Sequence, residues 1–245
     1  MARSARQQSE SGYHHVMMRG IGRQLLFENN DERNAFLDIV RRYRDAMNIS
    51  VIAWCLMDNH IHLLLKDNEG NLSKAMQRIA VTFAQFHNKN ADHVGHVFEN
   101  RFKSKPIESD AQLLACLRYI HDNPAKAGIC AADVYPWSSF REYVCGGELT
   151  DTDLVLDMLG GREAFLDFSH AAASAYDEPG KPMRMADEDA HTAMRTVLGE
   201  AGMYDLEYGS KEKRDAALRM LKGAGLTVRQ IERLTGIGRS TIQRA

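Results

Sequence analysis

The N-terminal half of the chain alternates between strand-like and helical hydrophobic patterns, and this order restricts the folds that it can adopt. Strands are predicted over 12–19, 51–57, 60–66 and 101–108, and helices from Asn30, over 71–88 and over 110–122. The turn dipeptide Asp58-Asn59 joins the second and third strands into a hairpin. Because β-α-β-β-α-β is the ferredoxin-like order, we expect an α+β fold, with a ferredoxin-like antiparallel sheet and helices on one side.

The C-terminal end shows three short helical patterns. They cover 211–222, 228–234 and 239–244, and Gly236-Ile237-Gly238 forms a turn before the last of them. Thr227 and Gln230 have the spacing of a capping box at the start of the second pattern. A helix, a glycine-bearing turn and a helix in this order indicate an all-α helix-turn-helix unit, with a dimerisation or packing tail as the alternative.

The net charge of −2 conceals an uneven distribution of charge along the chain. Residues 148–190 contain eleven acidic side chains against three basic ones, whereas residues 211–245 contain nine basic against three acidic. The basic end favours contact with the negatively charged backbone of DNA. We therefore predict an α+β domain over 1–147, an acidic and partly helical connector over 148–190, and a helix-turn-helix DNA-binding unit over 191–245.

Cysteine spacing and hydropathy indicate the compartment. The four cysteines are far apart and form no CxxC pair, which is typical of reduced thiols rather than of a disulfide framework or a zinc site. The N-terminal residues lack the apolar core of a signal peptide, and the run Leu63-Leu64-Leu65 is too short to cross a membrane. We expect a cytoplasmic protein with no membrane partner.

His60 and His62 are two residues apart on a predicted strand. Side chains at this spacing point to the same face, so the two imidazoles can converge on one ion. A histidine pair of this kind is more often part of a polar sheet face than a ligand pair. His14 and His15, which begin the first strand, are expected to be structural.

Tyr119 lies on the predicted helix 110–122, outside its apolar stripe. Leu113, Leu117 and Ile120 fall within one narrow stripe at helical spacing, and Tyr119 is expected on the opposite side. Asn123, four residues further, would project the same way, although Pro124 disfavours helical geometry at this position. A tyrosine outside the stripe is either an ordinary surface residue or a functional one.

The two motifs together resemble a known family. His60-Ile61-His62 followed by the segment from Tyr119 to Pro124 is similar to the HUH-superfamily single-tyrosine transposases, in particular the REP-associated tyrosine transposases, which act on repetitive extragenic palindromes. The resemblance covers about residues 12–145 and makes 1–147 a tyrosine transposase domain. Its supporting pieces are Tyr13-His14, Arg19-Gly20, the segment 100–103 and the segment 124–128. The helix-turn-helix is an addition that many relatives lack.

The resemblance implies a reaction and its site residues. Tyr119 would be the nucleophile that cuts single-stranded or hairpin DNA, giving a 5′-phosphotyrosine that a later hydroxyl attack converts into a rejoined strand. His60, His62 and, as a third ligand, Asn123 would hold Mg²⁺ or Mn²⁺, although imidazole ligands also suit zinc. His121 and an ion-bound water are the candidates for the base that assists the tyrosine. Relatives often work as homodimers.

Basic residues supply the candidate DNA contacts. Arg101, Lys103 and Lys105 alternate along the predicted strand 101–108 and would contact phosphates, with a solvated strand face as an equal alternative. In the C-terminal unit the candidates are Arg229, Arg239 and Arg244. The rival functions are a DNA-binding regulator that does not cleave and a metal-dependent hydrolase without a covalent step.

Overall fold

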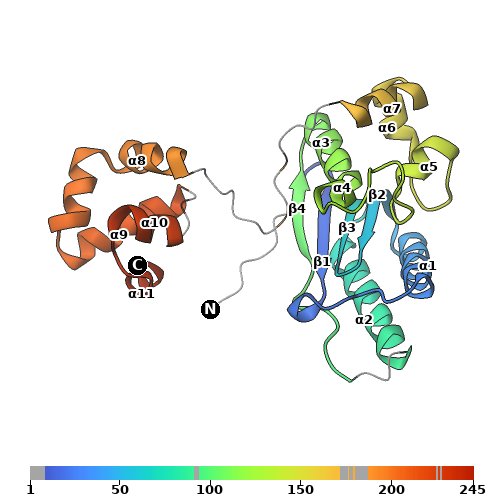
Figure 1. Cartoon of the computed structure of the whole chain (residues 1–245), viewed down its shortest axis with the longest axis horizontal. Coiled ribbons are helices and arrows are strands. Elements are labelled where there is room, and N and C mark those ends of the chain that lie inside the picture. Colours follow the sequence, from blue (N-terminus) through green and yellow to red (C-terminus); the bar gives the residue numbers. More distant parts are fainter. Residues whose placement is uncertain are drawn as a thin grey trace. The chain divides into compact units, whose positions relative to one another are not determined.

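The computed structural model describes residues 9–90, 94–171, 176, 179, 187–224, 226 and 228–245. The chain divides into two compact units, Met1–Gly180 and Lys181–Ala245 (Figure 1). The predicted boundaries at 147 and 190 differ from this division, because residues 148–171 of the predicted connector pack into the first unit. Among the residues described, no helix combines the length and the apolar character needed to cross a membrane.

The first unit is built on a four-stranded antiparallel sheet. Its strands are β1 (Tyr13–Arg19), β2 (Ile49–Met57), β3 (His60–Asp67) and β4 (Lys103–Ile107), in the spatial order β2-β3-β1-β4. This order, with β1 and β3 in the centre, is the one that the ferredoxin-like pattern predicts. The hairpin between β2 and β3 is confirmed, and β4 is shorter than predicted because pairing with β1 begins at Lys103.

Two helices cover one face of the sheet. Helix α1 (Asn30–Met47) begins where the Asn29 side chain accepts from the Glu32 backbone N–H at 3.0 Å, and it ends at Asn48 in the left-handed conformation. Helix α2 (Leu72–Asn90) lies against the same face. The apolar side chains that they bury from the sheet are Val16, Met18, Val51, Trp54, Leu56, Ile61, Leu63 and Leu65. The expected placement of the two inserted helices on one side is confirmed.

A second group of helices covers the opposite face, so the sheet is covered on both sides. It consists of α3 (Asp110–His121), α5 (Phe140–Cys145), α6 (Asp153–Leu159) and α7 (Arg162–His170). Val155 of α6 and Phe165 of α7 are fully buried there, which is why the acidic segment belongs to this unit. A register shift in β2 turns both Ile52 and Ala53 towards this face. The short helix η1 (Ile21–Arg23) follows β1, and α4 (Asn123–Lys126) follows α3.

The described residues of the second unit form only helices and their connections. The unit contains α8 (Asp187–Tyr208), which Gly199 interrupts, then α9 (Lys211–Gly223), α10 (Val228–Thr235) and α11 (Arg239–Arg244). Leu218, Leu221, Ile231 and Ile242 are fully buried in its core. Gly236, at φ +73°, ends α10 and begins the turn to α11, which gives the predicted helix-turn-helix order. Thr227 of the predicted capping box lies outside the described residues.

Candidate active site

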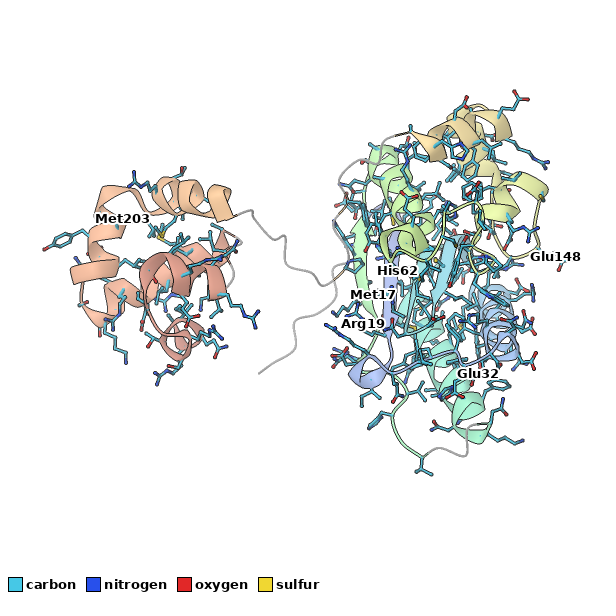
Figure 2. All side chains as sticks on the ribbon, viewed as in Figure 1. Met17, Arg19, Glu32, His62, Glu148 and Met203 are labelled. Atoms are coloured by element: carbon cyan, nitrogen blue, oxygen red, sulfur yellow. The ribbon has the colours of Figure 1, made fainter. Side chains whose placement is uncertain are left out.

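The two histidines of β3 lie on the face of the sheet that α3 covers. His60 is opposite Arg19 of β1 and His62 is opposite Met17. Figure 2 labels Met17, Arg19 and His62. The His60 and His62 rings have their centroids 5.0 Å apart with planes at 87°. His62 is fully buried and His60 is partly exposed. The predicted convergence of the two side chains is therefore present.

Helix α3 brings Tyr119 to these histidines. The Tyr119 ring lies 5.6 Å from the His62 ring, edge-on, and the side chain is half-buried. The expectation that Tyr119 faces away from the core is wrong in detail. Because α3 lies flat on the sheet, the flank of the helix that carries Tyr119 faces the histidine end of β1 and β3, while Leu117 and Ile120 point into the apolar part.

A third histidine, His15, completes the cluster. Its Nε2 lies 2.9 Å from His62 Nδ1, and its Nδ1 lies 3.0 Å from the hydroxyl of Tyr176. Burial, with the nearby Lys105 charge as a smaller cause, lowers the pKa of His15 to about 3, so the ring is neutral. The sequence predicted a structural role for His15. Strand alternation, combined with the pairing of β1 and β3, would have placed it beside His62.

Asn123 lies beyond the end of α3. That helix ends at His121, and Asn123 begins α4, where the next residue, Pro124, lacks the N–H that would continue the hydrogen bonds of α3. The Asn123 side chain is buried, and its Nδ2 donates to the Tyr119 carbonyl at 2.8 Å. This bond ties Asn123 to the end of the tyrosine helix and leaves the side-chain oxygen as the atom through which it would hold a metal.

His121 is not suited to act as the base. It is 2% exposed, its Nε2 lies 2.8 Å from Ser139 Oγ, and its ring packs against Phe140, Tyr143 and Phe165. Burial lowers the pKa of His121 to about 3, so the ring has little affinity for a proton near neutral pH. The base suggested by the sequence is thus a core residue, packed with the helices that cover the α3 face of the sheet.

Lys126 of α4 contacts Tyr119 from the other side. Its Nζ lies 4.1 Å from the centroid of the Tyr119 ring. Tyr176 also packs on this ring, with centroids 5.1 Å apart, and the Lys105 ammonium lies 5.0 Å from the Tyr176 ring. The Tyr119 ring is therefore in contact with the imidazoles of His15 and His62, with the Tyr176 ring and with the Lys126 ammonium.

The distance between the two histidine rings is suitable for binding one divalent cation. Two imidazoles that bind one ion at about 2 Å hold their ring centres roughly 5 Å apart, which is the separation of His60 and His62. His60 Nδ1 lies 2.7 Å from Asn59 Oδ1 and His62 Nδ1 contacts His15, so ligation would use both Nε2 atoms. Among the described residues, no group of three or more His, Cys, Asp or Glu side chains is arranged to hold a metal, so further ligands must be of other kinds.

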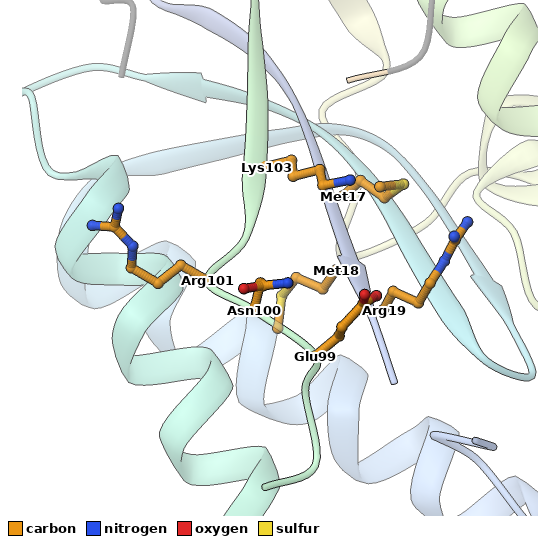
Figure 3. A pocket seen from close by; sticks show the side chains of 7 residues that line it. All are labelled: Met17, Met18, Arg19, Glu99, Asn100, Arg101 and Lys103. Atoms are coloured by element: carbon orange, nitrogen blue, oxygen red, sulfur yellow. The ribbon is translucent and has the colours of Figure 1, made fainter. Parts of the chain in front are cut away.

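The basic residues predicted to contact DNA lie near this cluster. Arg101 precedes β4 and is exposed, Lys103 is exposed on β4, and Lys105 is half-buried against Tyr176. Arg101 and Lys103 line a small pocket, shown in Figure 3, whose other lining residues are Met17, Met18, Arg19, Glu99 and Asn100. Met17 and Arg19 pair with His62 and His60, so the pocket borders the histidine strands. Its volume of about 20 Å³ holds little more than a water molecule.

The arginines of the second unit differ in how they are engaged. Arg229 and Arg244 are exposed on α10 and α11, and Arg244 Nε donates to the Ser240 carbonyl at 3.0 Å. Arg239, also exposed, forms an ion pair with Glu232 at 2.5 Å. Part of the positive charge of this unit is therefore neutralised within it.

Comparison with known proteins gives a family and a fold. Residues 8–123 match the model of a family described as IS200-like transposase. No curated protein matches the chain. The solved structure of a REP-associated tyrosine transposase bound to a REP hairpin matches with a TM-score of 0.51 at 17% identity, over 62% of this chain and 96% of that chain, which shows the fold. A structure from Deinococcus radiodurans R1 described as a transposase is 17% identical over 53% of this chain and 99% of that chain, with a TM-score of 0.35.

Proposed function

We propose that the chain, whose residues 8–123 match the model of the IS200-like transposase family, nicks and rejoins single-stranded DNA through a covalent tyrosine intermediate in a metal-dependent reaction. Processing of DNA follows from the family. The proposal of a covalent, metal-dependent mechanism rests on one observation. The Tyr119 ring lies 5.6 Å from the His62 ring, on the face of the sheet that holds the histidine pair.

Tyr119 is the nucleophile of this reaction. Its phenol oxygen attacks the phosphorus of the scissile phosphodiester, a new P–O bond forms, and the bond from phosphorus to the 3′ oxygen breaks. The products are a 5′-phosphotyrosine and a strand with a free 3′-hydroxyl. Because the phosphodiester energy is retained, attack by a 3′-hydroxyl on the phosphotyrosine restores a DNA strand and releases Tyr119 without ATP.

His60 and His62, through Nε2, and Asn123, through its side-chain oxygen, are the residues proposed to hold Mg²⁺ or Mn²⁺. When bound, the ion polarises the scissile phosphate and neutralises the charge that develops on it. The residues of the chain orient the reacting groups around it: α3 sets the Tyr119 ring edge-on to His62, and Asn123 is fixed by its bond to the Tyr119 carbonyl.

Lys126 stabilises the attacking tyrosine in this proposal. An ordinary phenol has a pKa of about 10, so negative charge on its oxygen needs support. The Lys126 ammonium, 4.1 Å from the ring centroid, favours the charge that develops there during attack. The proton passes to solvent or to the departing 3′ oxygen, since His121 is buried away from the tyrosine.

The DNA partner is proposed to be single-stranded or hairpin DNA. The neighbouring solved structure is that of a tyrosine transposase bound to a REP hairpin, and its fold is that of the first unit here. Arg101, Lys103 and Lys105 are proposed to contact the phosphates beside the histidine strands. We further propose a homodimer, which the molar mass of the purified protein in solution tests.

A covalent adduct assay tests the proposal. Purified protein is incubated with Mn²⁺ and end-labelled, hairpin-bearing single-stranded DNA, and protein–DNA adducts are separated under denaturing conditions. An adduct that is lost in Tyr119→Phe supports the proposal, and cleavage that survives in Tyr119→Phe contradicts the nucleophile and favours a hydrolase. DNA binding without any cleavage favours the regulator.

The second unit is proposed to bind DNA through its helix-turn-helix. Arg229 and Arg244 are exposed, whereas Arg239 must separate from Glu232 before it contacts a phosphate. Affinity for DNA falls as salt rises. Replacement of Arg229 or Arg244 by Ala should reduce the magnitude of the slope of log affinity against log salt concentration by about 1 each, and replacement of Arg239 should reduce it less. Equal slopes for the wild-type protein and the Arg229→Ala, Arg244→Ala double variant would contradict this role.

A further inference from the structure

His15 of β1 forms the link between the histidine pair and Tyr176. His15 and His62 are both fully buried on the same face of the sheet, and His15 Nε2 lies 2.9 Å from His62 Nδ1. The other ring nitrogen of His15 lies 3.0 Å from the Tyr176 hydroxyl. Three polar groups from β3, β1 and the segment after α7 therefore form one hydrogen-bonded row.

We infer that His15 is a positioning residue, which holds His62 in the one tautomer that presents Nε2 to a metal; this inference rests on the proposed metal site. A neutral imidazole carries one N–H and one lone pair, so the bond at one nitrogen decides the state of the other. With Nδ1 of His62 engaged by His15, only Nε2 remains for ligation, and it must carry the lone pair.

The row of hydrogen bonds is consistent with this tautomer from end to end. His62 Nδ1–H donates to His15 Nε2, and His15 Nδ1–H donates to the Tyr176 oxygen, which accepts. In the reversed row, Tyr176 donates to His15, His15 donates to His62 Nδ1, and the proton on His62 Nε2 closes that atom to a metal.

His60, the other histidine of the pair, is held in the corresponding tautomer. Its Nδ1 lies 2.7 Å from the side-chain oxygen of Asn59, and an amide oxygen can only accept. The proton of His60 is thereby held on Nδ1, with Nε2 as the ligating atom. Metal-binding histidines ordinarily donate their second N–H to a fixed acceptor in this way, and loss of that acceptor costs about 10–100-fold in metal affinity.

The tautomer of His62 can be measured without metal. We would label the histidines of the full-length protein with ¹⁵N and assign each ring from its two-bond ¹H–¹⁵N correlations. The inference predicts that His62 carries its proton on Nδ1 in the wild-type protein and that this preference weakens in His15→Leu. A proton on His62 Nε2 in the wild-type protein, or an unchanged tautomer in His15→Leu, would overturn it.

Mn²⁺ titration of the same variants gives the second readout. The affinity of His15→Leu should fall by about 10–100-fold, and His15→Gln, whose side-chain oxygen can accept from His62, should recover part of it. His14→Leu is the matched control, because His14 precedes His15 in β1, is buried, and points to the face of the sheet under α1 and α2. Wild-type affinity in His15→Leu, or an equal loss in His14→Leu, would overturn the inference.

Thermal unfolding separates a positioning role from general damage, since His15→Gln and His14→Leu should melt as cooperatively as the wild-type protein. The two proposals also fail differently. If the wild-type protein binds no Mn²⁺ and forms no adduct with DNA, the proposed function fails. The NMR measurement still decides, without metal, whether His15 sets the tautomer of His62.

Discussion

The two faces of the central sheet are made of the same strands but carry different side chains. Along β3, Ile61, Leu63 and Leu65 point to the face under α1 and α2, and His60, His62 and Leu64 point to the face under α3. Along β3 the first face is apolar at all three positions. The second is apolar along β3 only at Leu64, and it becomes a histidine cluster at the end where Tyr119 arrives.

With this difference, one strand would carry both stability and the proposed chemistry. Period-two alternation separates the two sets of side chains, so changes on one face leave the other largely unaltered. Burial of a polar ring costs free energy unless the ring is hydrogen-bonded, and the hydrogen bonds of His15 to His62 and Tyr176 offset that cost. Three predictions test whether the two faces are as separate as the structure indicates.

The largest effect is expected from the histidine pair. His60→Ala or His62→Ala should abolish the covalent DNA adduct, because each removes a proposed metal ligand, while most DNA binding remains, since phosphate contacts come from other residues. Adduct formation and hairpin binding are measured on the same preparations, with the exposed His96→Ala as the control. Equal loss of cleavage and of binding would mean that the histidines are structural.

The opposite face should show the reverse behaviour. Leu63→Ala removes a side chain that is 1% exposed under α1 and α2 and should lower the free energy of unfolding by about 2–5 kcal/mol. Adduct formation per folded molecule should persist at a temperature where the variant remains folded. Urea unfolding gives the first quantity and the adduct assay the second. Loss of the adduct in folded Leu63→Ala would show that the faces are coupled.

The smallest effect concerns pH and the apolar part of the second face. The folded protein holds the pKa of His121 near 3, below its ordinary value, so the unfolded chain binds the proton more readily. Stability from this group is therefore complete above about pH 6.5 and is lost as the pH falls towards 3, by up to about 1.4 kcal/mol per pH unit. Urea unfolding of His121→Leu between pH 7 and 5 should show a shallower dependence than the wild-type protein; an identical dependence would contradict it.

The sequence predicted most of the frame because hydrophobic periodicity is local. The four strands, the helices α1 to α3 and the helix-turn-helix order agree with the structure, and the boundaries differ by a few residues at β4. The packing of α6 and α7 was harder to foresee, because eleven acidic residues in 148–190 conceal the buried Val155 and Phe165. Net charge says little about where a few apolar side chains lie.

The candidate site was predicted only in part, because it depends on contacts between distant segments. His60, His62 and Tyr119 could be found from two motifs. His15 needed the register of β1 against β3, and Tyr176 needed the path of the chain 57 residues beyond Tyr119, which no local pattern contains. The sequence predicted the end of the tyrosine helix near 122, but not the separate turn of helix that holds Asn123, because Pro124 interrupts the helical projection between the two.

The most direct test of the account is the covalent adduct itself. Wild-type protein with Mn²⁺ and labelled hairpin-bearing single-stranded DNA should yield a denaturation-resistant protein–DNA species, and peptide mapping should place the 5′-phosphate on Tyr119. Tyr119→Phe, which keeps the ring packed beside His62, should give none, and Tyr43→Phe, on α1 under the opposite face of the sheet, is the matched control that should still form it. An adduct that persists in Tyr119→Phe, or maps to another residue, would contradict the central claim.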